Sequence, residues 1–293
     1  MSEILSPVSR RVREITIDAD GVQLSGLLGE PAHAPPRAVV VAVHGGGMRA
    51  GYFHGQAHPG LSLLELGAGL GFTVLALDRP GYGLSAAQLP TGQTLAEQSV
   101  TLHAALGAFA RRYQTGVGFF LLAHSFGGKL ALTAAADDIG DRLIGLDISG
   151  CGHRYAVDTD ELPDPHSLTT RRLSWGPLQL YPPNTFAGSR SLLVPMPERE
   201  WREAANWPGL LPGIARRVRV PVRLTFAEHE AWWRHDEEAV ATMTGMLSGT
   251  RVIVDRQPDA GHNISLGWAA RAYHLRALAF LEECMLRRAG TVT

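Results

Sequence analysis

Short apolar runs alternate with segments of helical pattern along most of this sequence, and that alternation limits the possible folds more than any other feature. Four runs are mostly apolar over the length of a strand: Ala38–Val43, which is continuously apolar, Phe72–Leu77, Phe119–Ala123 and Leu143–Ile148. Such runs are typical of strands that are covered on both faces. Because helical segments connect them, the chain is predicted to form a mostly parallel sheet flanked by helices.

The alternation is interrupted once, between Gly150 and about Arg216, where the sequence is rich in Pro, Trp and charged residues and has weak periodicity. It resumes with a strand predicted at Val220–Phe226. We therefore predict a core in two parts, residues 1–150 and 219–293, separated by an insertion at residues 151–218. Enzymes often use an insertion of this kind as a lid over a site at the carboxyl ends of the strands.

Composition and charge exclude several classes of protein. The chain has 293 residues, of which 45% are hydrophobic and 19% charged, and its formal net charge is -1. It therefore lacks the basic field that would attract nucleic acid or an anionic membrane. The amino-terminal segment has no apolar signal-peptide core, no run is long enough to cross a membrane, and only two cysteines occur. These features predict a cytoplasmic protein with reduced thiols.

A serine stands where a strand-length run meets a helix that opens with glycines. The segment Phe119–Gly128 passes through the small residue Ala123 to Ser125 and then to Gly127. In such a sharp turn the serine backbone is strained, and small neighbours prevent clashes. The turn also places the amino end of a helix beneath the hydroxyl. We therefore predict that Ser125 is a nucleophile, and the alternative is a serine that only caps the helix.

A glycine-rich loop directly follows the predicted strand Ala38–Val43. In this loop His44 is followed by three consecutive glycines. Such a loop lets backbone N–H groups face a ligand oxygen, and together with the N–H that follows the serine it can form an oxyanion hole. The predicted donors are Gly46 and Phe126, with Gly47 as the alternative. A loop that is merely flexible is the competing interpretation.

A histidine and an acidic residue are placed where they could assist the serine. His262 follows the last predicted strand, so it is the candidate general base. A carboxylate must hold the tautomer of such an imidazole and stabilise the imidazolium. The loop after the strand Val220–Phe226 offers two, and Glu230 is predicted ahead of the alternative Glu228. Asp147, at the end of an earlier strand, is a less favoured third candidate.

The chain order of serine, acid and histidine, each after a successive strand, resembles the α/β-hydrolase superfamily. The resemblance extends from about residue 13 to residue 288 and includes Leu77–Ser85, which is similar to the family's D-x-x-G-x-G-x-S turn. We interpret this turn as structural. Two departures are Ala123, where the family's G-x-S-x-G motif has its first glycine, and a glutamate instead of an aspartate as the acid. The resemblance implies the α/β-hydrolase fold with an inserted lid.

The resemblance also implies acyl chemistry. We expect a serine hydrolase that cleaves a carboxylic ester or thioester through an acyl-enzyme on Ser125, with His262 as general base. The expected partner is a small-molecule acyl substrate, either free or carrier-bound. One alternative is an acyltransferase, cyclase or eliminating enzyme that uses the same pair on a natural-product-like substrate. Another is a non-catalytic binding protein on the same fold.

The aromatic residues predict where an apolar substrate pocket would lie. Five of the six tryptophans fall between Trp175 and Trp233, and most of them are expected to pack the insertion against the core. Trp232 and Trp233 directly follow the predicted acid. We therefore expect these two, with His44 and His124, to line the pocket.

No metal and no cofactor are predicted. His54 and His58 are four residues apart, but a catalytic zinc needs a third protein ligand and a helix to align the pair. The segment 67–71 resembles part of a dinucleotide-binding motif, but it ends a predicted helix instead of opening one. The oligomeric state is not predicted.

Overall fold

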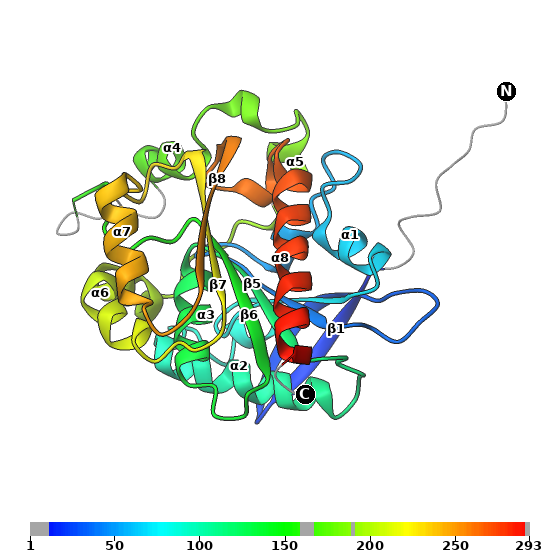
Figure 1. Ribbon diagram of the computed structural model, residues 1–293. Helices are drawn as coiled ribbons and strands as arrows, with labels where there is room; N and C mark the ends of the chain where they lie inside the picture. The colour runs from blue at the N-terminus through cyan, green and yellow to red at the C-terminus, as the bar shows by residue number, and fades with distance from the viewer. Residues whose placement is uncertain (1–11, 159–166, 189–190, 291–293) are drawn as a thin grey trace, which may run out of the picture.

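The computed structural model describes residues 12–158, 167–188 and 191–290, and its centre is an eight-stranded sheet (Figure 1). The strands are β1 Val12–Ala19, β2 Val22–Gly29, β3 Val39–Val43, β4 Thr73–Leu77, β5 Phe119–His124, β6 Leu143–Ser149, β7 Val222–His229 and β8 Val252–Gly261. Their spatial order is β1-β2-β4-β3-β5-β6-β7-β8. Only the pairs β1–β2 and β2–β4 are antiparallel. The mostly parallel sheet predicted from the alternation is therefore confirmed.

Helices cover both faces of this sheet. They are α1 Leu63–Gly69, α2 Leu95–Ala110, α3 Phe126–Ala136, α4 Leu168–Trp175, α5 Thr185–Gly188, α6 Glu198–Ala215, α7 Glu237–Met246 and α8 Ala270–Gly290. Short 3-10 helices lie at Ala50–Phe53, Gly83–Ala86, Leu178–Leu180 and Ile264–Leu266. Helices α1 and α8 pack against one face, and α2, α3, α6 and α7 against the other (Figure 1).

Strand β3 shows how the sequence forms two cores. All of its residues are buried, and their side chains alternate between the faces of the sheet. Val39, Val41 and Val43 join the core under α2 and α3, whereas Val40 and Ala42 join the core under α1 and α8. Each fully buried valine contributes about 1.5–3 kcal/mol of hydrophobic stabilisation. This burial on both faces explains why the run carries no polar position.

Capping residues set several helix boundaries. The spacing of Thr94 and Glu97 predicts a capping box, and at the start of α2 each side chain does bind the other residue's backbone N–H. The sequence pattern predicts the first helix over Pro59–Leu70, but α1 begins at Leu63, because the Ser62 hydroxyl accepts the Glu65 N–H at 3.2 Å. The sequence pattern predicts the last strand over Arg251–Asp255, whereas β8 extends to Gly261.

The interruption in the alternation lies between β6 and β7, and it contains a long helix that the sequence pattern did not indicate. Helix α6 has 18 residues and packs against α3. Its buried positions recur at helical spacing: Glu200, Ala204, Trp207, Leu211, Ile214 and Ala215. One of these positions is a charged residue, and two prolines lie inside the helix. These residues weaken the apolar signal by which an amphipathic helix is recognised.

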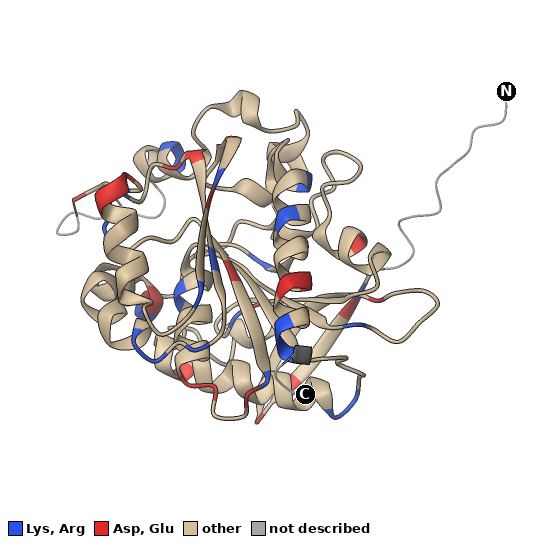
Figure 2. Cartoon of the chain, in the orientation of Figure 1, with Lys and Arg blue, Asp and Glu red and all other residues tan. Residues whose placement is uncertain are grey.

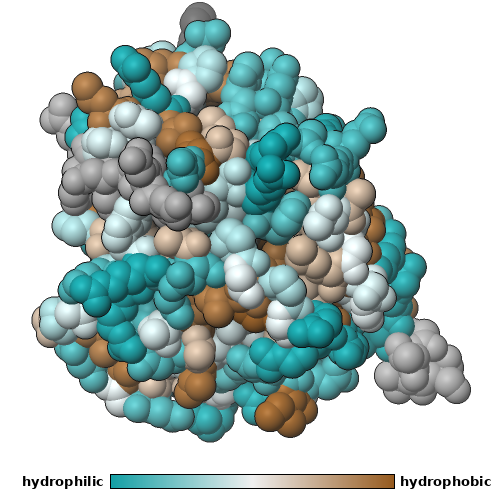
Figure 3. Space-filling model, turned by 90° about the vertical axis from the view of Figure 1, so that its left-hand side faces the viewer, coloured by the Kyte–Doolittle hydropathy of each residue, from teal (hydrophilic) through white to brown (hydrophobic). Residues whose placement is uncertain are grey.

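The surface carries both signs of charge. Arginines are interspersed with Asp and Glu over the described elements (Figure 2). On the face shown in Figure 3, hydrophobic residues form separate patches among hydrophilic ones. No helix in the described ranges is long and apolar enough to span a membrane. Both cysteines, Cys151 and Cys284, are buried and free.

Candidate active site

Ser125 occupies a strained turn between β5 and α3. Its backbone has φ 53° and ψ -117°, a conformation that costs a non-glycine residue about 1–3 kcal/mol. The Ser125 N–H donates to the carbonyl of Ser149 on the neighbouring strand at 2.8 Å. The hydroxyl stands at the N-cap position of α3 yet makes no capping hydrogen bond. The geometry therefore does not support the alternative of a helix-capping serine.

Glycine at position 127 is required by close packing below this turn. A Cβ on Gly127 would lie 2.2 Å from the carbonyl oxygen of Val43 and 2.6 Å from that of His44. No side chain fits at such distances, so α3 approaches the end of β3 only because this residue is glycine. Ala123, which replaces the first glycine of the family motif, is fully buried in β5.

His262 is held by Glu230. The Nδ1 atom of His262 lies 2.8 Å from Oε2 and 3.0 Å from Oε1 of Glu230. Oε1 also accepts the backbone N–H of Trp232 at 2.9 Å. Both side chains are buried, with exposed fractions of 5% for His262 and 7% for Glu230. Because the carboxylate binds Nδ1, the nitrogen of His262 left for other partners is Nε2.

The other two candidate acids contact different groups. Glu228 is exposed, and its Oε2 accepts the backbone N–H of Asp259 at 2.8 Å. Asp147 is buried inside β6, where it pairs with Arg223 and accepts the Tyr273 hydroxyl at 2.9 Å. Of the three acids weighed from the sequence, only Glu230 is brought to the histidine.

The predicted oxyanion donors lie on the two loops that flank Ser125. The N–H groups of Gly46 and Phe126 have no hydrogen-bond partner within the described part of the chain. The N–H of Gly47, the alternative donor, is instead bound to the Tyr82 hydroxyl at 3.0 Å. The geometry thus favours Gly46 over Gly47 as the donor from this loop.

His44 does not line the cavity, and its expected place in the pocket is corrected. Its ring is fully buried behind the glycine loop, where Nε2 accepts the backbone N–H of Arg79 at 3.0 Å. Its Nδ1 lies 2.8 Å from the carbonyl oxygen of Gly45. Burial and, to a smaller extent, the nearby Arg79 cation together lower the pKa of His44 to about 3, so the ring is neutral. The residue supports the loop from behind.

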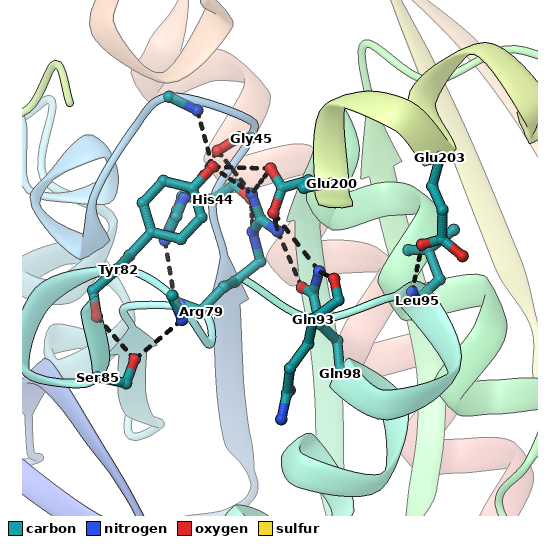
Figure 4. Close-up of polar contacts among 12 residues, drawn as sticks. His44, Gly45, Arg79, Tyr82, Ser85, Gln93, Leu95, Gln98, Glu200 and Glu203 are labelled. Atoms are coloured by element: carbon teal, nitrogen blue, oxygen red, sulfur yellow. Dashed lines mark hydrogen bonds and ion pairs between the residues drawn. The ribbon is translucent and has the colours of Figure 1, made fainter. Parts of the chain in front are cut away.

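A buried network around Arg79 joins the glycine loop to the insertion (Figure 4). The Arg79 side chain donates from Nε to the carbonyl of His44 at 2.8 Å and from Nη2 to that of Gly45 at 3.1 Å. Its guanidinium also pairs with the Glu200 carboxylate of α6 at 2.6 and 2.8 Å. The Tyr82 hydroxyl donates to the same carboxylate at 2.7 Å. Arg79 therefore makes a charge-assisted, two-point contact with the insertion and at the same time binds the loop that carries Gly46.

Ser125 and His262 line one cavity of about 830 Å³, which is within the roughly 300–1,000 Å³ typical of small-molecule sites. Its walls come from the glycine loop, the start of α3, the loop after β7 and the insertion. Of the predicted pocket residues, His124, Trp232 and Trp233 line it. Trp232 also donates from its indole Nε1 to Ser174 of α4 at 3.2 Å, which ties the loop after β7 to the insertion.

His124 is a neutral wall residue. Its ring stacks on Tyr52 with centroids 4.7 Å apart and lies at the same centroid distance from His262. Complete burial, followed by the proximity of His262, lowers the pKa of His124 well below its ordinary value. Gly150 allows both rings to approach, because a Cβ there would lie 2.9 Å from a carbon of each imidazole.

The two histidines discounted as zinc ligands have other partners. Nδ1 of His54 lies 2.7 Å from the Ser62 hydroxyl, and His58 packs edge-on against Trp268. Within the described ranges, no group of three or more His, Cys, Asp or Glu residues is arranged to hold a metal ion.

Comparison with known proteins identifies the family. The sequence model described as alpha/beta hydrolase family matches residues 40–278, which is most of the chain. The protein belongs to the alpha/beta hydrolase family. The match extends from β3 into α8 and includes the serine turn, the insertion and the histidine.

Solved structures of alpha/beta hydrolases have the same fold. A thermostable carboxyl esterase from Bacillus coagulans aligns with a TM-score of 0.68 at 16% identity, over 94% of this chain and 99% of that one. The thioesterase domain from the curacin biosynthetic pathway aligns with a TM-score of 0.60 at 14% identity, over 91% and 99%. E-2-(acetamidomethylene)succinate hydrolase aligns at 0.61 and 18%, over 92% and 98%. At these identities the likeness establishes the fold alone, and the predicted α/β-hydrolase fold is confirmed. Among curated proteins, none matches this sequence.

Sequence reasoning missed three residues at the site: Arg79, Glu200 and Lys129. Arg79 belongs to the turn that was interpreted as structural, and Glu200 lies in a helix that was not predicted. Lys129 lines the cavity one turn of α3 beyond Ser125. Lys129 follows Ser125 by four residues in a helix that begins at the serine. This spacing indicates that the two side chains lie near the same end of the helix.

Proposed function

We propose that this alpha/beta hydrolase is a serine hydrolase that cleaves a carboxylic ester or thioester through an acyl-enzyme on Ser125. The observation that carries the proposal is the strained backbone of Ser125 at the wall of a cavity that His262 also lines. A turn of this kind projects a hydroxyl away from its own helix. The hydrogen bond from His262 to the buried Glu230 carboxylate supports the role of His262 as a base.

In the proposed mechanism His262 accepts the Ser125 proton at Nε2 while Oγ bonds to the acyl carbon. The Glu230 carboxylate stabilises the imidazolium that forms. The N–H groups of Gly46 and Phe126 would bind the oxyanion, at about 2.7–4 kcal/mol each by analogy with other serine hydrolases. The bond to the leaving oxygen or sulfur then breaks, and His262 returns the proton to it. Water then attacks the acyl carbon of the acyl-enzyme, again with His262 as base, and the bond to Ser125 breaks to release the acid.

The insertion at residues 151–218 is proposed to act as a lid over this cavity. Its described residues supply much of the wall of the cavity that Ser125 lines, and its helix α6 is bound to the core through Glu200. Trp232 and Trp233 are proposed as apolar walls for the acyl group. The substrate is then a small acyl ester or thioester, either free or carrier-bound. A cytoplasmic location and the absence of nucleic-acid and membrane partners remain predictions from the sequence.

Intact-mass analysis after treatment with a fluorophosphonate tests the nucleophile directly. The expected result is one adduct on the wild-type protein and none on Ser125→Ala, with the unreacted variant folded by circular dichroism. Untreated wild-type protein should release acid from a simple ester. In that reaction, added alcohol or amine acceptors should compete with water for the acyl-enzyme only weakly. Absence of an adduct on folded wild-type protein would overturn the proposal in favour of a binding role. Dominant transfer to an acceptor would favour the acyltransferase alternative.

A further inference from the structure

Lys129 is the only lysine among the 27 lysine and arginine residues of this chain. It lies on α3, four residues after Ser125, which is about 6 Å along the helix axis. Its side chain lines the same cavity and is almost completely buried, with an exposed fraction of 3%. A buried ammonium is costly unless something in its surroundings compensates the charge.

The groups that contact Lys129 are neutral. Its Nζ donates to the Tyr155 hydroxyl at 2.8 Å and, at the longer distance of 3.5 Å, to the carbonyl of Ala204 on α6. Four aromatic rings surround the ammonium at 5.2–5.8 Å from Nζ to their centroids: Phe126, Tyr155, Trp207 and Trp233. These contacts stabilise a cation, but they use only two of its three N–H donors.

The two carboxylates whose charge acts on Lys129, Glu200 and Glu203, are hydrogen-bonded to other groups. Glu200 pairs with Arg79 through both oxygens, and Glu203 accepts the backbone N–H of Leu95. Neither forms a salt bridge with Lys129. The ammonium therefore has a free donor and no carboxylate of its own within the described part of the chain.

The rest of the cavity has the same sign of charge. Arg171 and Arg172 line its exposed edge, on the insertion. Among the described lining residues there is no Asp and no Glu. A pocket lined by one sign of charge with apolar walls attracts ligands of the opposite sign.

We propose that Lys129 binds a free carboxylate on the substrate, so that the enzyme acts on esters or thioesters that are also carboxylic acids, such as half-esters of dicarboxylic acids. This inference rests on the proposed acyl-enzyme chemistry and names its substrate class. A carboxylate matches the single remaining donor, whereas proteins bind a dianionic phosphate with several donors. The carboxylate does not react; it fixes the substrate while Ser125 attacks the ester carbon, and it leaves with the product.

A matched pair of substrates tests the preference in the wild-type protein. The monoanionic para-nitrophenyl ester of adipic acid is compared with its neutral methyl-capped analogue, which has the same chain. We expect kcat/KM to favour the anion by about ten-fold or more, mainly through KM. A second pair carries the charge in the alcohol part: acetyl esters of hydroxybenzoic acid and of its methyl ester. Preference for the anion in either pair supports the proposal, and preference in neither overturns it.

The variant Lys129→Met removes the charge and keeps the length of the side chain. We expect the ratio of kcat/KM for the preferred anion to kcat/KM for its neutral analogue to fall about 10- to 100-fold. A purely structural lysine would instead lower both kcat/KM values together and leave their ratio unchanged, which would contradict the proposal. Lys129→Arg keeps the charge and should recover part of the preference.

A binding measurement separates this inference from the proposed reaction. Because the chain has one lysine, lysine labelled with ¹³C at Cε gives a single side-chain signal in the NMR spectrum. At pH 7, adipate should shift that signal on the Ser125→Ala variant, and neutral adipamide should not. A shift without any ester hydrolysis would reject the proposed function and leave the carboxylate site standing. No shift with adipate would overturn the site even if esters are hydrolysed.

Discussion

Arg79 and Glu200 form a buried ion pair that connects the turn after β4 to the insertion helix α6, with N–O distances of 2.6 and 2.8 Å. Both side chains are almost fully enclosed, with exposed fractions of 1% and 0%. The same guanidinium holds the carbonyls of His44 and Gly45, so the position of the glycine loop depends on a residue of the insertion. The pair therefore couples the placement of the insertion to the geometry of the proposed oxyanion hole.

Glu200→Ala should be strongly destabilising because it leaves the Arg79 charge buried without its partner. We expect a loss of about 3–5 kcal/mol in the free energy of unfolding, measured by urea denaturation. Glu198→Gln on the same helix is the matched control, since its ion pair with Arg202 is exposed and should contribute less than about 1 kcal/mol. Equal losses in the two variants would show that the buried pair has no special role.

Glu230→Gln should lower kcat by about 10³- to 10⁴-fold with little change in KM, because an amide cannot stabilise the imidazolium of His262. Glu228→Gln should change kcat less than about ten-fold, since Glu228 contacts only the Asp259 N–H near the site. Steady-state kinetics on one ester measure both. If Glu228→Gln were the more damaging change, the acid would be reassigned.

Ser125→Gly should be more stable than Ser125→Ala. The backbone at this position has φ 53°, which glycine adopts without strain and alanine does not. We expect the free energies of unfolding of the two variants, measured by thermal unfolding, to differ by about 1–3 kcal/mol. Both variants should be inactive. Identical melting temperatures would mean that the turn relaxes when the hydroxyl is removed and that the serine side chain itself maintains the strain.

Lys129→Met should raise the melting temperature at pH 7. Burial lowers the pKa of Lys129 from 10.5 to about 8, so the folded protein carries an unfavourably buried charge below that pH. As pH rises from about 8 towards 10.5, the folded state loses this proton while the unfolded state retains it, which stabilises the wild type. The difference in melting temperature between the variant and the wild type should therefore become smaller over that pH interval.

Calorimetry of both proteins between pH 7 and pH 10 measures this difference, in which other groups common to the two proteins cancel. The titratable or charged groups that face Lys129 are Tyr155, Cys151, Arg79, Glu200 and Glu203. A difference in melting temperature that stays constant across the range would contradict the lowered pKa.

The sequence alone determined those parts of the fold and of the site that depend on local properties. The continuous apolar run predicts strand β3, and the small residues around Ser125 predict the turn. In both cases the residues that cause the structure lie within a few positions of each other. The capping box at Thr94 is equally local. Where the end of an element depended on its neighbours, as with β8, the predicted boundary was displaced.

Only the tertiary structure decided between residues that are alike in sequence. Glu228 and Glu230 both stand at the end of β7, but the chain turns Glu230 inward to His262 and leaves Glu228 at the surface. His44 adjoins the glycine loop yet packs behind it. In each case the role of the side chain depends on whether it is buried and on which residues surround it. Those surrounding residues come from segments that are distant in the chain. Local sequence specifies backbone shape, whereas burial and charge pairing depend on contacts that form only when the whole chain has folded.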